Sequence, residues 1–390
     1  MKKTIHNNTL VPIIMWLDEV EPSAMQQAEN LANLPFVFKH IALMPDCHSG
    51  YGMPIGGVIA ARNVIVPNAV GVDIGCGMCA VQLSLHEIKK ESLKKIMNEI
   101  RQQVPLGFKH HKEKQNENLM PDTKNLPEKG IVKREYDSAL YQIGTLGGGN
   151  HFIEIQKGND GHIWLMIHSG SRNLGLKVAE YYHKTAKSFI MKNKPDYNVP
   201  SDLAFLPFET EEAQAYWQEM NYCVEFALAN RKHMMDTVTQ AVQKHVKKKI
   251  ETLQFINIAH NYAQHETHFG ENVIVHRKGA TSARNGELGI IPGSQGTKSY
   301  IVRGKGNPMS FQSCSHGAGR IMGRKQAQRE LSLEDEISKL ESKGIIHSVR
   351  TVKDLDEAPG AYKLIDEVMQ NQNDLVEIVT ELVPLAVIKG

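Results

Sequence analysis

The chain has 390 residues, and its 45 Lys and Arg residues against 43 Asp and Glu residues give a formal net charge of +2 at pH 7. With 41% hydrophobic and 23% charged residues, its composition is that of an ordinary globular protein, which excludes collagen-like, coiled-coil and disordered classes. Because there is no overall excess of basic residues, any contact with nucleic acid must come from a local patch. No Pro- or Ser-rich linker and no internal repeat divides the chain, so we expect a single domain over residues 1–390.

No segment approaches the roughly 20 apolar residues of a membrane span, and the N-terminus lacks the apolar core of a secretory signal. We therefore expect a cytoplasmic protein that does not bind membranes. The odd number of cysteines, at irregular spacing, favours reduced or metal-bound thiols over disulfides. These cysteines are Cys47, Cys76, Cys79, Cys223 and Cys314.

Taken in chain order, glycine-punctuated runs predict strands within residues 36–85. Residues 109–135 are polar, basic and without periodicity, which predicts a mobile loop that could act as a lid. A helical insertion is expected at about residues 176–250, because apolar residues between 211 and 249 recur at spacings of three or four. This pattern predicts one long helix or two joined ones. Further strands are expected at residues 163–167, 255–259, 273–275 and 300–302. Together these elements predict a mixed α/β (α+β) fold, with central β-sheets flanked by helices.

The first chemically distinctive motifs are Pro45-Asp46-Cys47-His48 and Gly71-Val72-Asp73-Ile74-Gly75-Cys76-Gly77-Met78-Cys79. Asp73 and Cys76 lie three residues apart in a glycine-rich turn, so a carboxylate and a thiolate can converge on one ion. A strand-to-strand turn with a buried thiol is the alternative interpretation. The Cys76-x-x-Cys79 spacing could also indicate a zinc knuckle or a redox pair, but no second Cys-x-x-Cys and no thioredoxin-like context supports either.

Later motifs add histidines and a glycine run. Gly147-Gly148-Gly149 offers unobstructed backbone N–H groups to phosphate oxygens. On an extended strand His151 and Glu154 face opposite sides, so one could meet a metal ion and the other a different wall of the site. The other motifs are His168-Ser169-Gly170-Ser171-Arg172, His260-Asn261-Tyr262 and Ser313-Cys314-Ser315-His316-Gly317-Ala318-Gly319-Arg320. Each alone is typical of a loop. Together they predict a divalent-metal site beside a phosphate-binding loop and a histidine nucleophile.

On these motifs, and over a region from Trp16 to Gly390, the chain resembles the RtcB family of RNA ligases. These GTP-dependent enzymes join RNA 3′-phosphate or 2′,3′-cyclic phosphate ends to 5′-hydroxyl ends. The resemblance implies an RtcB-like fold, a role in RNA repair or tRNA splicing, and His316 as the residue that becomes guanylylated. It implies that Asp46 accepts a hydrogen bond from the other ring nitrogen of His316. It also implies two Mn²⁺ ions, with Cys76 able to bridge them, held by Asp73, Cys76, His151, His168 and His260.

The same resemblance implies a guanine pocket. Glu154 would accept from guanine N1–H and N2–H₂ and Lys389 would donate to O6, a polarity that adenine reverses. The other implied nucleotide-binding residues are Asn150, Phe152, Lys278, Ser294, Ser299, Gly317, Ala318, Gly319 and Tyr362. Candidates for binding terminal RNA phosphates are Arg172, Arg320 and Arg324. The chain departs from the family pattern at Gln295, where many relatives carry Met, while Cys47 fills a variable position; neither is an implied metal ligand.

Two alternatives stay open at this point. One is a catalytically silent RNA-binding or sensor protein, and the other is a metal-dependent phosphoesterase that only opens cyclic phosphates. The basic residues 247–249 are most simply the end of a helix, and residues 109–112 are most simply a solvated loop, with RNA contact as the alternative for both. We expect a monomer whose partners are GTP and RNA.

Overall fold

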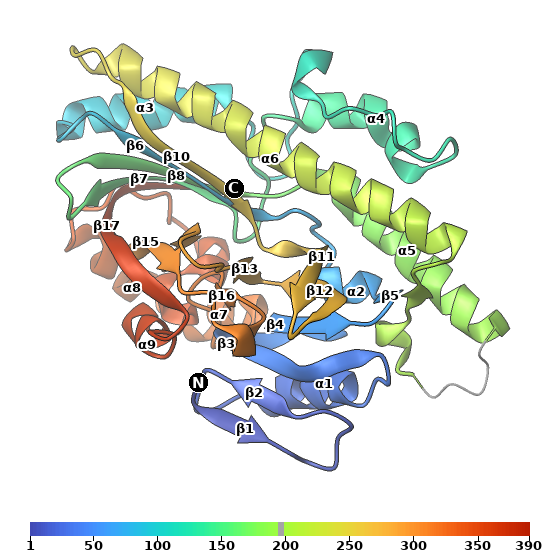
Figure 1. Ribbon diagram of the computed structural model, residues 1–390. Helices are drawn as coiled ribbons and strands as arrows, with labels where there is room; N and C mark the ends of the chain where they lie inside the picture. Colours follow the sequence, from blue (N-terminus) through green and yellow to red (C-terminus); the bar gives the residue numbers. More distant parts are fainter. Residues whose placement is uncertain (194–198) are drawn as a thin grey trace.

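The computed structural model describes residues 1–193 and 199–390, which form two large β-sheets with helices packed against them (Figure 1). This confirms the predicted mixed α/β class with central sheets flanked by helices. Residues 194–198, part of the predicted helical insertion at 176–250, lie outside the described residues. The division of the chain into domains stays a prediction.

The first sheet is built mainly from the N-terminal part of the chain and has the strand order β1-β2-β3-β4-β12-β11. Its strands are β1 (Lys3–Ile5), β2 (Ile13–Met15), β3 (Val37–Tyr51), β4 (Met53–Ala61), β12 (Glu271–Lys278) and β11 (Asn261–His268). All neighbours are antiparallel except β2 and β3. The pairing of β3 with β4 shifts register between Leu43 and His48, and the segment with Asp46 lies in this irregular stretch. Such irregularities redirect side chains out of the regular pleat.

The second sheet has the order β10-β6-β8-β7-β17-β15-β14 and is antiparallel throughout. Its strands are β10 (Thr252–Ala259), β6 (Gly77–Leu83), β8 (Ile163–Ser169), β7 (Phe152–Gly158), β17 (Val376–Lys389), β15 (Ser299–Gly304) and β14 (Leu288–Ile291). Two-stranded pairs are formed by β13 (Ala280–Ser282) with β16 (Ser313–Ser315) and by β5 (Val64–Ile65) with β9 (Leu206–Pro207). The runs predicted as strands at 163–167, 255–259, 273–275 and 300–302 are all confirmed.

The long helix α6 (Glu211–His245) crosses one face of the second sheet beside α3 (Lys90–Gln103) (Figure 1). Its N-terminus is capped by the hydroxyl of Thr210, which accepts from the backbone N–H of Ala213 at 3.3 Å. Apolar side chains at helical spacing, including Met234 and Val238, pack into a core with sheet residues such as Val81. The predicted helix at 211–249 is therefore one helix rather than two.

The end of α6 differs from the prediction. The helix stops at His245, because Val246 is extended, so the basic residues 247–249 lie beyond it and do not form its last turn. Lys244 and His245 take that role, and both contact Glu99 of α3, at 2.7 and 2.5 Å. The cationic end of the helix is thus held by a neighbouring carboxylate as well as by the helix dipole.

The remaining helices pack on the sheets or on one another. They are α1 (Pro22–Ala32), α2 (Pro67–Val70), α4 (Ile131–Gln142), α5 (Arg172–Asn193), α7 (Arg324–Glu330), α8 (Leu333–Glu341) and α9 (Ile365–Gln370). Short 3₁₀ turns are η1 (Glu117–Leu119), η2 (Ser201–Leu203), η3 (Pro308–Ser310), η4 (Val352–Glu357) and η5 (Pro359–Ala361). The predicted loop at 109–135 thus contains one such turn and ends within the first turns of α4. None of the described helices combines the length and apolar character needed to cross a bilayer, and all five cysteines are buried and unbridged.

Candidate active site

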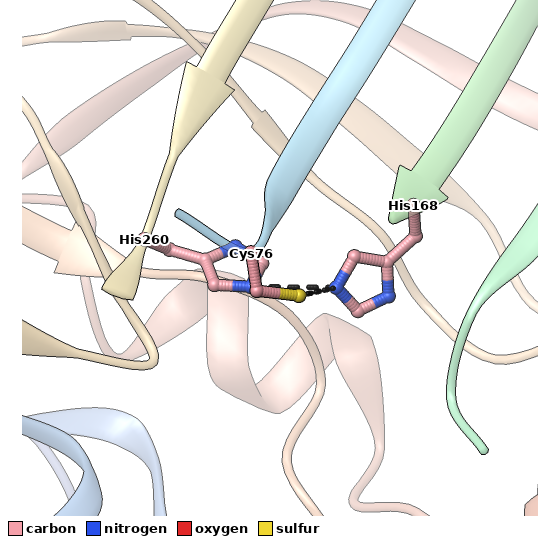
Figure 2. Close-up of side chains that lie close together, drawn as sticks. All are labelled: Cys76, His168 and His260. Atoms are coloured by element: carbon pink, nitrogen blue, oxygen red, sulfur yellow. Dashed lines mark hydrogen bonds between the residues drawn. The ribbon is translucent and has the colours of Figure 1, made fainter. Parts of the chain in front are cut away.

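The residues predicted to bind metal lie at the same end of four neighbouring strands of the second sheet. Asp73 and Cys76 precede β6, His151 precedes β7, His168 is close to the end of β8, and His260 follows β10. Backbone register brings these strand ends together through the pairs Gly77 with Ser169, Gly77 with Ala259, and Phe152 with His168. Figure 2 shows three of these side chains converging from separate strands. Antiparallel pairing thus gathers residues that lie up to 187 positions apart, from 73 to 260.

The atoms that could bind metal ions, here called the metal-binding cluster, form two groups that share Cys76. In one group, Cys76 Sγ lies 3.3 Å from His168 Nε2, which lies 3.3 Å from His260 Nε2 (Figure 2). In the other, Cys76 Sγ lies 3.4 Å from His151 Nε2, which lies 3.1 Å from Asp73 Oδ2. Within each group the three atoms lie within 4.8 Å of one another. The two groups could therefore hold adjacent metal ions with the sulfur between them.

Hydrogen bonds on the far side of two of the rings set their tautomers. His151 Nδ1 lies 3.0 Å from the carbonyl oxygen of Leu146, and His168 Nδ1 lies 3.0 Å from that of Asn150. A carbonyl can only accept, so each Nδ1 must carry the proton and each Nε2 lone pair is free to bind a cation. This arrangement is typical of histidines that bind metals.

The charge states also fit a cation. Burial, reinforced by neighbouring histidines, holds the pKa of His168 and His260 well below the usual range, so both rings are neutral. Burial opposes ionisation of Asp73, but hydrogen bonding from His151 brings its pKa below the usual value. Burial and the nearby Asp73 charge raise the pKa of the Cys76 thiol, so a thiolate there requires a positive charge beside it. Imidazole, carboxylate and thiolate together suit Mn²⁺ or neighbouring divalent metals.

A buried arginine that the sequence analysis missed holds this edge of the sheet. Arg231 of α6 donates from one guanidinium nitrogen to the carbonyl oxygens of Gly75 and Ser169, both at 2.8 Å, and from Nε to Asn257 Oδ1 at 2.8 Å. Burial lowers the pKa of Arg231 to about 10, so it keeps its charge. The signal was present in the helical periodicity, because residue 231 falls on the same face as the buried residue Ala227.

The predicted nucleophile stands next to the metal-binding cluster. The ring of His316 lies 4.7 Å, centre to centre, from that of His260. His316 Nδ1 is 2.6 Å from Asp46 Oδ2, and Asp46 is fully buried. The same oxygen accepts from the backbone N–H groups of His316 and Gly317, at 3.0 and 3.3 Å. The carboxylate therefore accepts a hydrogen bond from Nδ1–H and leaves the Nε2 lone pair available, the arrangement expected of this pair from the sequence.

A cavity opens beside His316 and brings together most of the predicted nucleotide-binding residues. Those that line it are Asn150, Phe152, Glu154, Ser294, Gly317, Ala318, Gly319, Tyr362 and Lys389. Two others lie outside the lining. Lys278 is buried and donates to the carbonyl oxygens of Tyr51 and Asn68, at 2.5 and 3.1 Å. Ser299 lies behind the wall, where its hydroxyl accepts from Gln156 Nε2 at 3.2 Å and from the N–H of Gly293 at 3.3 Å.

One wall of the cavity carries a buried carboxyl group and a buried amine. Strand pairing places Lys389 of β17 opposite Phe152 of β7, and Glu154 lies on the same face of β7, two residues on. Burial raises the pKa of Glu154 to about 8, and burial also lowers the pKa of Lys389. Glu154 accepts one hydrogen bond, from Gln156 Nε2 at 2.6 Å. Glu154 could therefore accept hydrogen bonds from a planar polar ligand, and Lys389 could donate one to the same edge of that ligand.

Glu357 also lines the cavity, and the sequence analysis missed it. Its carboxylate contacts Arg320 and Arg324, both at 2.8 Å, and the hydroxyl of Tyr362. The two arginines and Tyr362 were predicted, but residue 357 lies in an ordinary acidic stretch with no motif to mark it. Glu357 holds the two arginines at the cavity wall.

Arg172 lies on a different side of the metal-binding cluster. Its Nε donates to Thr145 Oγ1 at 3.2 Å, and its guanidinium packs so closely on Gly147 that a Cβ there would collide with it. Arg324 packs in the same way on Gly149. Both glycines have positive φ, at 90° and 70°. The predicted glycine run is therefore a surface on which two arginines rest.

Comparison with known proteins places these features in a family. A family model described as tRNA-splicing ligase RtcB matches residues 27–131 and 121–390. The chain is 40% identical over 405 residues to the RNA-splicing ligase RtcB of Escherichia coli (strain K12), and the match covers 97% of each chain. It is 34% identical to the tRNA-splicing ligase RtcB of Nanoarchaeum equitans, over 95% of this chain and 92% of the relative. Identity to that of Thermococcus kodakarensis is 32%, over 94% and 91%.

Proposed function

This chain belongs to the RtcB family, and from that premise we propose that it is a GTP-dependent RNA ligase active in RNA repair or tRNA splicing. It joins RNA 3′-phosphate or 2′,3′-cyclic phosphate ends to 5′-hydroxyl ends through a covalent adduct between His316 and GMP. The observation that carries the proposal is the contact between the buried Asp46 and the partly exposed His316, which lies beside the metal-binding cluster and lines the cavity with Glu154.

In the first step His316 attacks GTP. The Nε2 lone pair forms a bond to the α-phosphorus, the bond from that phosphorus to the bridging oxygen breaks, and pyrophosphate leaves. Nδ1 keeps its proton, and the Asp46 carboxylate stabilises the positive charge that the ring then carries, at the 2.6 Å contact. Two divalent cations, proposed here as Mn²⁺, would be held by Asp73, Cys76 and the three histidines and would supply positive charge near the phosphates.

In the second step an oxygen of the RNA 3′-phosphate attacks the α-phosphorus. The bond to Nε2 breaks, His316 returns to its neutral state, and the RNA carries GMP on its 3′-phosphate through a phosphoanhydride. The 5′-hydroxyl of the second strand then attacks the RNA phosphorus, loses its proton to solvent, and expels GMP. A cyclic phosphate must first be opened by water. Arg320 and Arg324, held by Glu357, are proposed to bind the terminal phosphates.

Guanine selectivity is proposed to come from Glu154 and Lys389. An ionised Glu154 accepts from guanine N1–H and N2–H₂, and Lys389 donates to O6. Adenine presents an acceptor at N1 and a donor at C6, so both contacts would fail. A site with one buried acceptor and one buried donor discriminates strongly between guanine and adenine, because adenine would leave both buried groups without hydrogen-bond partners.

Mass spectrometry of the intact protein after incubation with GTP and Mn²⁺ tests the proposal. We expect one GMP adduct, absent in His316→Ala and present in His86→Ala, a control at an exposed histidine. An unshifted mass, or an adduct that survives His316→Ala, would overturn the assignment. The same experiment separates the alternatives, because neither a silent RNA-binding protein nor a cyclic phosphoesterase would form a covalent adduct at His316.

A further inference from the structure

A tight turn next to the active site presents an aromatic ring to solvent. Phe108 is 99% exposed, more than any other large hydrophobic side chain in the described residues. Its sequence neighbours Lys109 and His110 are also exposed. The ring packs against nothing in the folded chain, so its whole face is available to a ligand.

The turn is anchored on both sides, so the ring does not belong to a loosely held segment. Leu106 pairs with Gly147 in a parallel bridge, and the N–H of Gly107 donates to the carbonyl oxygen of Gly147 at 3.0 Å. The N–H of Lys109 closes the turn on Leu106 at 3.2 Å. On the far side, the N–H of His111 donates to the carbonyl oxygen of Tyr141 at 3.0 Å.

The anchor point belongs to the active site. Gly147 begins the glycine run that leads, four residues later, to His151 of the metal-binding cluster. A Cβ at Gly148 would lie 3.7 Å from the Cα of Gly107, so the turn rests directly on this run. The turn that carries Phe108 therefore packs on the glycine run that leads into the candidate active site.

Basic side chains lie close to this turn and to the glycine run on which it packs. Arg172 donates to the carbonyl oxygen of Gly107 at 3.4 Å, and its charge is close enough to His110 to add to the effect of burial in lowering the pKa of that histidine. Arg324 rests on Gly149 of the same glycine run, and Lys109 is free in solvent. An aromatic face among such charges matches the way single-stranded nucleic acid is bound, with bases stacked on rings and phosphates held by cations.

We propose that Phe108 stacks against a base of the RNA strand close to the end being joined, while Arg172 and Lys109 bind the phosphates of that strand. The inference rests on the proposed ligase function and names a contact within it. A protein partner is a poorer match, because the ring has charged neighbours instead of an apolar surround.

The test is a binding experiment with single-stranded RNA that ends in a 3′-phosphate, measured by fluorescence anisotropy without GTP. A series of oligonucleotides carries one abasic nucleotide at each of the last few positions. For the wild type, at least one abasic position should weaken binding by about 5- to 100-fold, the usual range for loss of one stacked base. The Phe108→Ala variant should bind intact RNA more weakly than the wild type, by a similar factor. It should bind the abasic RNA and the intact RNA with equal affinity. Phe108→Trp should keep the discrimination.

The matched control is Phe255→Ala, which removes a half-exposed aromatic ring on β10. It should bind RNA like the wild type. The proposal is overturned if Phe108→Ala binds intact RNA as tightly as the wild type, if the discrimination against abasic RNA persists without the ring, or if the substitution changes only the oligomeric state. Failure of the ligase proposal would be seen separately, as the absence of a GMP adduct in the wild type.

Discussion

Asp46 concentrates its interactions on one carboxylate oxygen, which accepts from His316 Nδ1 and from two backbone N–H groups. In Asp46→Asn the amide oxygen can still accept these bonds, but the negative charge is lost. We expect formation of the GMP adduct to slow by about 10- to 100-fold, because the hydrogen bonds that remain are to a neutral group and are roughly half as strong. Single-turnover kinetics with labelled GTP measures this rate. The exposed residue Asp18 supplies the control, Asp18→Asn, and an unchanged rate in Asp46→Asn would contradict the assigned role.

Cys76 and Cys79 share a short motif but face different surroundings. Cys76 belongs to both metal-binding groups, whereas Cys79 lies in the core that α6 forms with the second sheet. We expect Cys76→Ala to lose bound Mn²⁺ and all adduct formation, because no other side chain supplies the shared sulfur. Cys79→Ala should keep its metal and lose only modest stability. Metal analysis after dialysis measures the difference. Equal metal loss in the two variants would show that the cysteines act as a pair.

Glu154 predicts a pH dependence for guanine binding. Burial raises its pKa to about 8, so the carboxyl group is mostly protonated at pH 7, whereas guanine N1–H and N2–H₂ need it ionised. Binding therefore releases a proton, and affinity should rise by about tenfold per pH unit below pH 8 and level off above it. In the free protein the same shift makes Glu154 reduce stability as pH rises from 4.5 to about 8.

Calorimetry with guanosine, which carries no phosphate, isolates this effect from the metal-binding cluster. Glu154→Gln should bind guanosine weakly at every pH, because an amide offers a single acceptor where the carboxylate offers two. Thermal unfolding of the same variant should show an intact fold. A flat affinity profile in the wild type would contradict the assignment of Glu154 to the guanine edge.

At the scale of the element, α6 both covers the second sheet and clamps the strands that carry the metal-binding residues. Arg231 joins the segments that end at Gly75 and Ser169 through two 2.8 Å bonds from one nitrogen. Arg231→Met should leave both carbonyl groups buried without partners and cost about 3–5 kcal/mol of unfolding free energy. Lys232→Ala removes only an exposed ion pair with Asp236 and should cost about 0–1 kcal/mol.

Urea unfolding monitored by circular dichroism measures both variants of α6. Because the clamp also fixes the strand ends, Arg231→Met should bind Mn²⁺ more weakly even where it remains folded. If the two substitutions proved equally mild, the buried arginine would not organise the site.

Local patterns predicted the elements well where one face is buried. The spacing of Met220, Met234 and Val238 predicted α6, and glycine-punctuated runs predicted the strands. The position of the helix end depended on tertiary contacts instead. Glu99, on a helix more than 100 residues earlier, binds Lys244 and His245, and sequence periodicity carries no information about such a partner.

At the scale of the whole molecule, the motifs predicted which candidate metal ligands lie together and that Asp46 contacts His316, and the resemblance to a known family supplied the roles that we propose for them. Each motif held several chemically active residues at fixed spacing, so it was visible without the fold. Glu357 and Arg231 could not be identified from the sequence, because their importance comes from the residues that they contact in the folded chain. Lys278 shows the reverse case, since a motif residue that looked suited to the nucleotide pocket donates to buried carbonyl groups instead.

In the proposed mechanism, the phosphate at the new junction comes from the 3′ end of the RNA. The direct measurement places a radioactive label on the 3′-terminal phosphate of one strand and follows it during joining to a 5′-hydroxyl strand with GTP and Mn²⁺. We expect the label to be retained in the junction, where phosphatase cannot remove it, and we expect no joining of 3′-hydroxyl ends to 5′-phosphate ends. Recovery of the label as free phosphate alongside a joined product would contradict it.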